Sequence, residues 1–410
     1  MSDLRSYGAV TAAYWGFTLT DGALRMLVLL HFHRLGFTPL DLAYLFLLYE
    51  AMGIVTNFVG GWIAARFGLR LTLFLGLATQ IVALGLLSQL RADWSIDFSI
   101  IYVMGAQALS GVAKDLTKMS SKSAVKLVVK DDGEDKGTLF RWVAILTGSK
   151  NALKGLGFLL GGVLLEWVGF ENSLLLMALS LVVVLGTTAL VVKVDLGKAK
   201  QKIRTKELFS KSRAINVLSF ARIFLFAARD VWFVVGLPVF LYSTLGWSFD
   251  EVGAFMALWV IGYGTVQALV PKLTQKVKDP HSGIGAARFW GGALAILPAV
   301  IAVVLWQDLS FSGAFLLVGL LVFGFVFAVN SSLHSYLIVA CSDSDKVALN
   351  VGFYYMANAI GRLVGTLLSG LIFQYAGLEA CLLASTMMLV VATLTVFFLE
   401  PEKSSVSSLT

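Results

Sequence analysis

The stretch that decides the fold reads KGLGFLLGGVLLEWVGFE from residue 154 to 171, and RLVGTLLSGLIFQYAGLE follows from 362 to 379. A constant offset of 208 residues places Lys154 on Arg362, Gly157 on Gly365, Gly162 on Gly370, Gly169 on Gly377 and Glu171 on Glu379. Any two glycine-rich apolar helices share some positions, but a matched cation, three glycines and an acid are hard to obtain from composition alone. The match indicates that the second half of the chain repeats the first.

The composition is that of a polytopic membrane protein. The chain has 410 residues, of which 58% are hydrophobic and only 14% charged, and its mean hydropathy is +0.83. A helix needs about 20 apolar residues to cross about 30 Å of hydrocarbon. Twelve such segments centre near Leu19, Ile54, Gln80, Leu109, Leu153, Val182, Phe226, Leu258, Ala295, Leu320, Ala359 and Leu389. Because these segments are continuous rather than alternating like barrel strands, we predict an all-α protein with twelve transmembrane helices.

A basic block at the middle of the chain, VKVDLGKAKQKIRTKELFSKSR, occupies residues 192–213. It divides a six-helix half, residues 1–191, from a second half, residues 214–410, and we interpret it as a cytoplasmic linker. Lys and Arg accumulate in every second connection, which the positive-inside rule assigns to the cytoplasm. The sequence therefore predicts a multi-pass protein of the inner (plasma) membrane with both termini cytoplasmic. The first segment contains Asp21 and Arg25 and has no cleavage pattern, so we expect it to remain as a helix rather than act as a signal peptide.

Ionisable residues follow a period of three along the segments. The third, sixth, ninth and twelfth have none in their apolar cores, so each can face lipid. Other segments carry Asp21, Arg25, Glu50, Lys114, Asp115, Lys150, Lys154, Arg222, Arg229, Asp230 and Arg362. A charge at mid-bilayer costs at least about 2.5–3.5 kcal/mol, so we expect these groups to face a water-filled cavity or one another.

The connection after the second segment, GGWIAARFGLR, resembles the signature of the major facilitator superfamily at this place. Gly61, Arg66, Gly68 and Arg70 match its gating motif, whereas Ala65 stands where an acid is usual. GFLLGG, at 157–162, is similar to the antiporter glycine motif, with Phe158 in place of proline. The resemblance implies two six-helix halves related by a pseudo-two-fold axis along the membrane normal, with substrate held between them.

Three further segments are similar to the ArsJ family of organoarsenical efflux permeases. They are YWGFTLTDGALRMLVLLHFHRLGF (14–37), LSGVAKDLTKMSSKSAVK (109–126) and LTGSKNALKG (146–155). This resemblance implies antiport-type efflux of 1-arseno-3-phosphoglycerate, the ester that glyceraldehyde-3-phosphate dehydrogenase makes when arsenate replaces phosphate. It also implies arsenical resistance that depends on pairing with that dehydrogenase.

The charged residues indicate an anionic substrate independently of the resemblance to a family. Counting Lys118 with the groups above, eight bases stand against four acids in the apolar segments. A phosphate monoester carries about −1.5 to −2 charges, so a molecule with a phosphate at one end and an arsenate ester at the other would fit this surplus of four cations. The candidate substrate-binding residues are Arg25, Lys114, Lys118, Lys150, Asn151, Lys154, Arg229, Tyr355, Asn358 and Arg362.

Structural roles remain open for several of these candidates. Lys118 could flank the membrane and Lys114 could extend its amine to the interface. The neutral residues could serve only as contacts between helices. Arg222 is expected near the cytoplasmic entrance, with Arg229 deeper in the cavity.

Asp21 and Glu50 are the candidates for proton coupling. Asp21 and Arg25 are four residues apart on one helix, so a structural salt bridge is equally compatible with the sequence. Glu50 has no cation nearby in sequence, and burial would favour its protonated form.

The two cysteines, Cys341 and Cys381, are expected near opposite ends of their helices and cannot form one thiolate site for trivalent arsenic. We find no P-loop, HExxH or nucleophile-elbow motif, and therefore predict no metal, no cofactor and no enzymatic activity. Transport would be driven by ion or solute gradients. The alternatives are an organophosphate:phosphate exchanger, a proton-coupled multidrug exporter and a receptor that does not transport.

Overall fold

The computed structural model describes residues 2–67, 69–91, 93–128, 136–192, 212–273, 279–341 and 347–399. Within these ranges the secondary structure is helical throughout, and no strand occurs. The helices are α1 (Ser2–Arg34), α2 (Pro39–Phe67), α3 (Leu69–Leu87), α4 (Ile96–Val128), α5 (Lys136–Trp167), α6 (Phe170–Val191), α7 (Arg213–Phe233), α8 (Gly236–Ser243), α9 (Phe249–Leu273), α10 (Pro280–Trp306), α11 (Ser312–Ala340) and α12 (Val347–Val396).

These helices provide the twelve expected crossings. The short α8 continues α7, and α12 consists of two helices joined at Gly377, where φ is 75° and ψ is −174°. Nine stretches of the described residues are long and apolar enough to span a membrane, with α7–α8 and α12 each counted once. The helices α1 and α5, which contain Asp21, Arg25, Lys150 and Lys154, are not among them. Each of the twelve centres lies in a helix, so the predicted fold class is confirmed.

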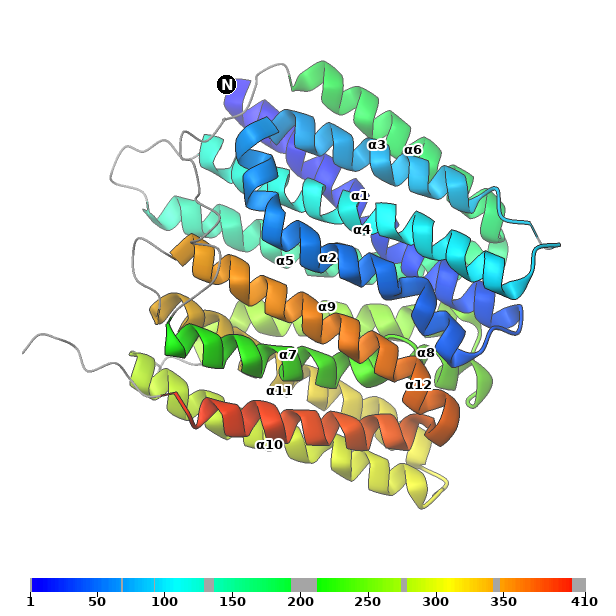
Figure 1. Ribbon diagram of the computed structural model, residues 1–410, viewed down its shortest axis with the longest axis vertical. Coiled ribbons are helices and arrows are strands. Elements are labelled where there is room, and N and C mark those ends of the chain that lie inside the picture. The colour runs from blue at the N-terminus through cyan, green and yellow to red at the C-terminus, as the bar shows by residue number, and fades with distance from the viewer. Residues whose placement is uncertain are drawn as a thin grey trace, which may run out of the picture.

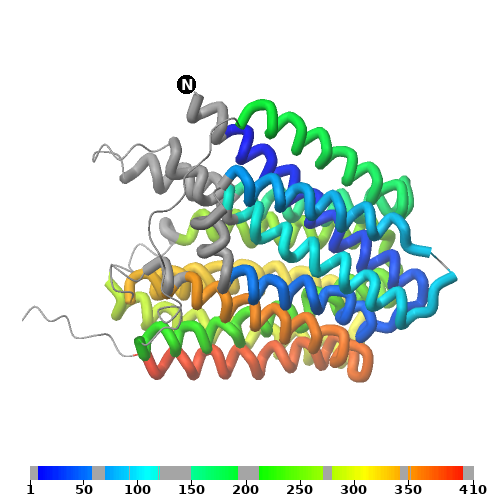
Figure 2. Tube along the Cα trace, turned by 45° about the horizontal axis from the view of Figure 1, so that its top comes forward, coloured from blue at the N-terminus to red at the C-terminus, as the bar shows by residue number. Residues whose placement is uncertain are grey.

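The helices run side by side, with α1–α6 in one part of the molecule and α7–α12 in the other (Figure 1). We call the end with residues 35–38, 168–169 and Gly377 the turn face. The opposite end, where α1 begins and α6 ends, is the terminal face, and Figure 2 shows the coloured parts of α1 (blue) and α6 (green) running toward it. Residues 193–211 lie outside the described residues, so the limits of the predicted linker stay a prediction.

The internal repeat has a direct structural counterpart. Gly169 and Gly377 both have positive φ, 85° and 75°, at the turns that follow α5 and the first part of α12. Gly157 packs against the carbonyl of Leu19 in α1, and Gly365 packs against the carbonyl of Ala227 in α7. The same offset of 208 residues relates Leu19 to Ala227, so equivalent helices pack through equivalent positions in the two halves.

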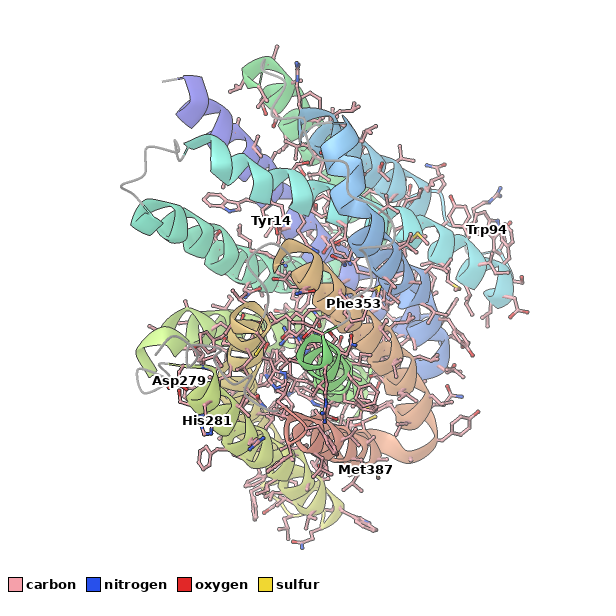
Figure 3. All side chains as sticks on the ribbon, turned by 60° about the vertical axis from the view of Figure 1, so that its left-hand side comes forward. Tyr14, Trp94, Asp279, His281, Phe353 and Met387 are labelled. Atoms are coloured by element: carbon pink, nitrogen blue, oxygen red, sulfur yellow. The ribbon has the colours of Figure 1, made fainter. Side chains whose placement is uncertain are left out.

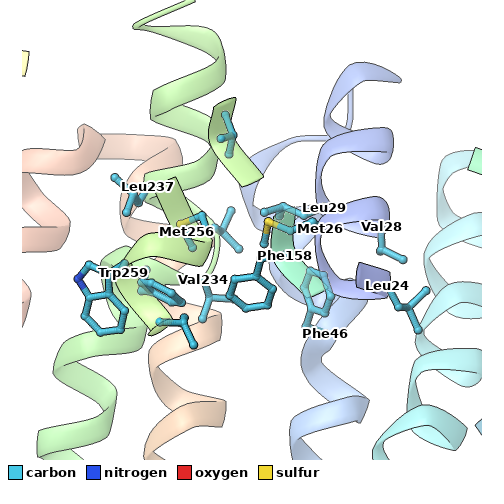
Figure 4. Close-up of a cluster of buried hydrophobic side chains, with 14 of the residues drawn as sticks. Leu24, Met26, Val28, Leu29, Phe46, Phe158, Val234, Leu237, Met256 and Trp259 are labelled. Atoms are coloured by element: carbon cyan, nitrogen blue, oxygen red, sulfur yellow. The ribbon is translucent and has the colours of Figure 1, made fainter. Parts of the chain in front are cut away.

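Glycines of the repeat also bring the two halves together near the turn face. A Cβ atom at Gly162 of α5 would collide with the carbonyl of Phe249 in α9, and one at Gly370 of α12 with that of Pro39 in α2. Phe158, which replaces the usual proline of the glycine motif, is buried between these helices. Figure 4 shows its ring between side chains of α1 and α2 and those of α7–α9. The motif therefore forms part of the contact between the halves.

We expect Gly370→Ala to force α2 and α12 apart, because the new methyl group would overlap a backbone carbonyl that cannot move independently. Transport should fall at least tenfold, with a lower unfolding temperature. Gly352→Ala is the matched control on the same helix, since no atom lies within 4 Å of its added Cβ. Equal activity of the two variants would show that the close contact is unnecessary.

The outer helices are those that the charge pattern predicts. Leu190 of α6 is 75% exposed, Phe289 of α10 is 70% exposed and Met387 of α12 is 66% exposed. Met387 lies on the outside of the last helix in Figure 3, and α6 and α10 lie at opposite edges of Figure 1. These apolar surfaces are suited to contact with lipid.

The sequence reasoning overlooked one cation in these outer helices, Arg288 of α10. Its guanidinium donates to the carbonyls of Phe397 and Leu399, at 3.3 and 3.2 Å. It therefore satisfies backbone acceptors at the end of α12. The start of α10 is fixed by a capping box, in which the backbone N–H of Ser282 donates to Asp279. This hydrogen bond lowers the pKa of the Asp279 carboxyl.

Candidate substrate site

A chain of buried ion pairs connects the two halves. Glu50 of α2 accepts from Arg25 of α1 at 2.5 Å and from Arg362 of α12 at 2.6 Å, both through Oε1. Arg362 Nε lies 3.5 Å from Asp230 Oδ2, and Arg229 Nη2 lies 2.5 Å from Asp230 Oδ1. We call these five residues the ion-pair chain. The sequence predicted that its members would face a water-filled cavity or one another, but their partners were not predictable, because they come from four helices.

The ion-pair chain lies deep in the membrane-spanning region. Glu50 is about 11 residues from the turn-face end of α2, and Arg362 is about 15 residues before Gly377. At 1.5 Å per residue, these positions are roughly 16 and 22 Å from the turn face. That depth is near the middle of a bilayer, where unpaired charges are most costly. The ion-pair chain passes from one half to the other through the Glu50–Arg362 pair.

Two lysines next to this chain have no carboxylate partner among the described residues. Lys154 Nζ lies 5.7 Å from the centroid of the Phe158 ring, and Lys114 Nζ lies 4.0 Å from that of Tyr49. The described ion pairs include neither lysine, although both side chains are only partly exposed. Contacts with aromatic faces offset only part of the energy of removing an ammonium from water. These two amines are the strongest candidates to bind an anion.

Asp21 has a different partner from the one that its sequence neighbour suggested. The hydroxyl of Tyr49 donates to its two carboxylate oxygens at 2.7 and 3.0 Å. Arg25, four residues away, pairs with Glu50 instead. The proposed Asp21–Arg25 salt bridge is therefore absent from the ion pairs of the described residues. Tyr49, which the sequence reasoning missed, connects Asp21 to the amine of Lys114.

Lys118 lies within the helix bundle, where it is paired. Its Nζ lies 3.0 Å from Asp115 Oδ1 and donates to Asn57 Oδ1 at 3.0 Å. Asp115 also accepts a short hydrogen bond from Thr56. The cation is thus neutralised locally, and the favoured role of Lys118 is to hold α4 against α2. Thr56 and Asn57 had no sequence signal that distinguished them from other polar residues in apolar helices.

The uncharged candidate residues differ in whether they contact other side chains or have a polar atom without a hydrogen-bond partner among the described residues. Asn151 of α5 donates to Gln267 of α9 at 3.2 Å, so it serves as a contact between the halves. The ring of Tyr355 lies 5.8 Å from Lys118 Nζ. Asn358, one turn before Arg362 on α12, has a buried Oδ1 without a hydrogen-bond partner in the part of the chain that the structure describes. Asn358 is therefore the best placed of the three to accept from a substrate hydroxyl.

The remaining candidates lie toward the terminal face. Lys150 is one turn before Lys154 on α5, and its ammonium is only partly exposed. Arg70 lies at the start of α3, with its guanidinium 5.3 Å from the Phe74 ring. The other residues of the gating motif, Gly61, Arg66 and Gly68, fall outside the residues whose side chains are described. Cys341 follows α11 at the terminal face and Cys381 lies beyond Gly377, so the two thiols are separated as expected.

The charges around Glu50 leave a net positive site. We define the central cluster as Asp21, Arg25, Glu50, Lys114, Asp115, Lys118, Lys154, Arg229, Asp230 and Arg362. Its six cations and four carboxylates sum to a formal charge of +2. A ligand with two negative charges would neutralise this cluster.

The fold and this site define a membrane transporter built from two repeated halves. The model of the Major Facilitator Superfamily matches residues 7–346 and, in a second placement, residues 218–409. The chain therefore belongs to this superfamily, and is a multi-pass membrane protein. The overlap of the two placements is consistent with the internal repeat.

Solved structures of transporters share the fold at low sequence identity. A POT family transporter in complex with a thioalcohol-conjugated peptide has a TM-score of 0.74 and 16% identity, covering 96% of this chain and 95% of that one. The nucleoside transporter NupG has a TM-score of 0.70 and 14% identity, covering 97% and 99%. An inward-facing bacterial homologue of the iron transporter ferroportin has a TM-score of 0.68 and 16% identity, covering 96% and 98%. No curated protein matches the sequence.

Proposed function

We propose that this transporter exports an organic oxyanion with an anionic group at each end, and that its substrate is 1-arseno-3-phosphoglycerate. The observation that carries the proposal is the pair of lysines, Lys114 and Lys154, without carboxylate partners in a central cluster of formal charge +2. A molecule with a phosphate at one end and an arsenate ester at the other supplies compensating charge. Export would proceed by alternating access between the halves and would give arsenate resistance.

The geometry of Arg362 supports an oxyanion in particular. Its Nη2 donates to Glu50, whereas its Nε and Asp230 Oδ2 form a longer ion pair without a hydrogen bond. A guanidinium can bind a tetrahedral oxyanion through two parallel N–H groups. A substrate oxygen could therefore use the Nε–H that the protein leaves without a hydrogen bond. Lys154 would add a point charge from the opposite half.

Proton coupling is assigned to Asp21 in this proposal. Glu50 lies between two guanidiniums, which stabilise its ionised form, whereas Asp21 accepts hydrogen bonds only from the Tyr49 hydroxyl among the described residues. Asp21 is thus the candidate carboxylate that no guanidinium binds among the described residues. The inner-membrane location with both termini cytoplasmic, and the division at residues 192–213, are part of the same proposal.

The alternative with most support is an organophosphate:phosphate exchanger. The same lysines and arginines would bind a phosphate monoester without arsenic, because both ligands present tetrahedral oxyanions. A proton-coupled multidrug exporter has less support, since a hydrophobic cation would be repelled by a cluster of charge +2.

Arsenate resistance in cells tests the substrate. We expect strong protection when this chain is produced together with a glyceraldehyde-3-phosphate dehydrogenase that accepts arsenate. Protection should be weak when either protein is produced alone, because little ester is then made or none is exported. Resistance that does not depend on the dehydrogenase, or equal protection against arsenite, would favour the organophosphate exchanger instead.

A further inference from the structure

A second buried cation lies outside the central cluster, within the C-terminal half. Arg222 of α7 is 4% exposed, and its Nη1 donates to the carbonyl and the hydroxyl of Ser331 in α11, at 3.1 and 3.0 Å. The sequence placed this residue at the entrance to the cavity, which is wrong, because helices α7, α11 and α12 enclose it. Its Cζ lies 4.1 Å from the centroid of the Phe226 ring and 4.7 Å from that of Tyr354.

The guanidinium has no carboxylate partner in the described part of the chain. The nearest acid along α7 is Asp230, about eight residues or roughly 12 Å away along the helix axis. Asp230 is already paired with Arg229 and Arg362. The charge of Arg222 is therefore not neutralised by the side chains around it.

Unsatisfied polar atoms accompany this charge. Arg222 Nε, Ser219 Oγ one turn earlier on α7, and His334 Nδ1 one turn after Ser331 on α11 are all buried without a hydrogen-bond partner among the described residues. Ser219 is 3% exposed and His334 is 1% exposed. Buried polar atoms are nearly always satisfied in native proteins, by protein groups, water or an ion. We call these residues, with Ser331 and Tyr354, the Arg222 pocket.

We propose that the Arg222 pocket binds a single small monovalent anion of the halide class, separately from the central cluster. Arg222 Nε–H, the Ser219 hydroxyl and, in the appropriate tautomer, His334 Nδ1–H are hydrogen-bond donors. One negative charge neutralises the single guanidinium. Leu218, Leu333 and Leu337 belong to the buried apolar cluster of the same region, which disfavours a dianion that would leave one charge uncompensated.

The anion has a structural consequence for the C-terminal half. It would complete the packing of α7 against α11 at the level where α7 approaches the terminal face. The pocket also lies on the helix that carries Arg229 and Asp230, so its occupancy would stabilise the part of α7 from which the central cluster is built. This inference does not rest on the organic substrate and can be tested without it.

Unfolding of the purified full-length chain tests the proposal, with sodium bromide compared with sodium gluconate at equal ionic strength. At about 100 times the dissociation constant, bromide should raise the unfolding temperature by about 3 °C. Arg222→Met should abolish this increase. Arg288→Met is the control and should retain it, because Arg288 binds carbonyl oxygens at the end of α12. No increase in the wild type, or an increase retained in Arg222→Met, would overturn the proposal.

A direct measurement keeps the proposal falsifiable if Arg222→Met fails to fold. Crystals of the wild-type protein grown in bromide should give an anomalous scattering peak in contact with Arg222 Nε. A pocket that contains only ordered water at saturating bromide would refute the anion site. Because no phosphate or arsenate ester is present in either experiment, failure here would leave the proposed transport function untouched.

Discussion

Lys154→Met should abolish transport and at the same time raise the unfolding temperature of the protein. The amine of Lys154 has no carboxylate partner among the described residues, so its replacement by an apolar side chain of similar length relieves an uncompensated buried charge. Binding of the proposed ester should weaken by about 1.5–3 kcal/mol, the scale of a hydrogen bond to a charged group. This corresponds to roughly 10- to 150-fold in the dissociation constant.

The opposite signs of the two effects separate a binding role from a structural one. Lys154→Arg should keep most of the affinity, because the charge is retained although the geometry differs. Arg91→Met is the control for loss of a cation at the surface, since Arg91 is paired with Asp93 at an exposed position. If Lys154→Met lowered the unfolding temperature and left substrate affinity intact, Lys154 would be a structural residue and the proposed site would be wrong.

The sequence predicted the fold well because the determinants of a membrane protein are local. Each apolar segment must span the bilayer by itself, so twelve spans could be recognised without knowledge of their neighbours. The repeat of Gly169 and Gly377 was equally visible, since a turn with positive φ favours glycine wherever it occurs. The sequence also predicted that α6 and α10 face outward, because few or no ionisable residues occur in the apolar cores of these helices.

The partners within the site were not predictable, because they depend on how distant helices are rotated about their axes. Arg25 is four residues from Asp21 in sequence, yet it pairs with Glu50 from the next helix. Arg222 and Arg229 lie on one face of α7 by their spacing, but one is enclosed in the C-terminal half and the other belongs to the ion-pair chain. If a helix were rotated about its axis by a fraction of a turn, its charged residues would meet other neighbours, although the sequence pattern would be the same.

Glu50→Gln should destabilise the protein more than any other single substitution in the ion-pair chain. The carboxylate lies between two guanidiniums, at 2.5 and 2.6 Å, and its loss would leave both cations without their shared partner. Breaking a buried ion pair from one side costs about 3–5 kcal/mol. Thermal unfolding of Glu50→Gln, Arg362→Gln and the double variant measures the interaction as a double-mutant cycle.

The two substitutions should be strongly non-additive, with a coupling energy of about 1–3 kcal/mol, because the residues share a buried hydrogen bond across the halves. The control cycle uses Arg91→Gln and Asp93→Asn, whose ion pair at 3.3 Å is 69% and 67% exposed. Its coupling should be close to zero, since solvent screens a surface pair. Additive effects of the Glu50 and Arg362 substitutions would show that this contact does not hold the halves together.

The same substitution, which lowers the stability of the protein, should strengthen substrate binding. Glu50→Gln raises the formal charge of the central cluster from +2 to +3 and frees the Nη2 of Arg362, which an oxyanion could then occupy. We therefore expect a lower dissociation constant for the proposed ester, measured on protein that remains folded at low temperature, together with slower transport. The physical reason is competition: in the wild type the substrate must share Arg362 with Glu50, so that binding weakens the contact between the halves. Unchanged or weaker binding in Glu50→Gln would separate the ion-pair chain from the substrate site and confine its role to stability.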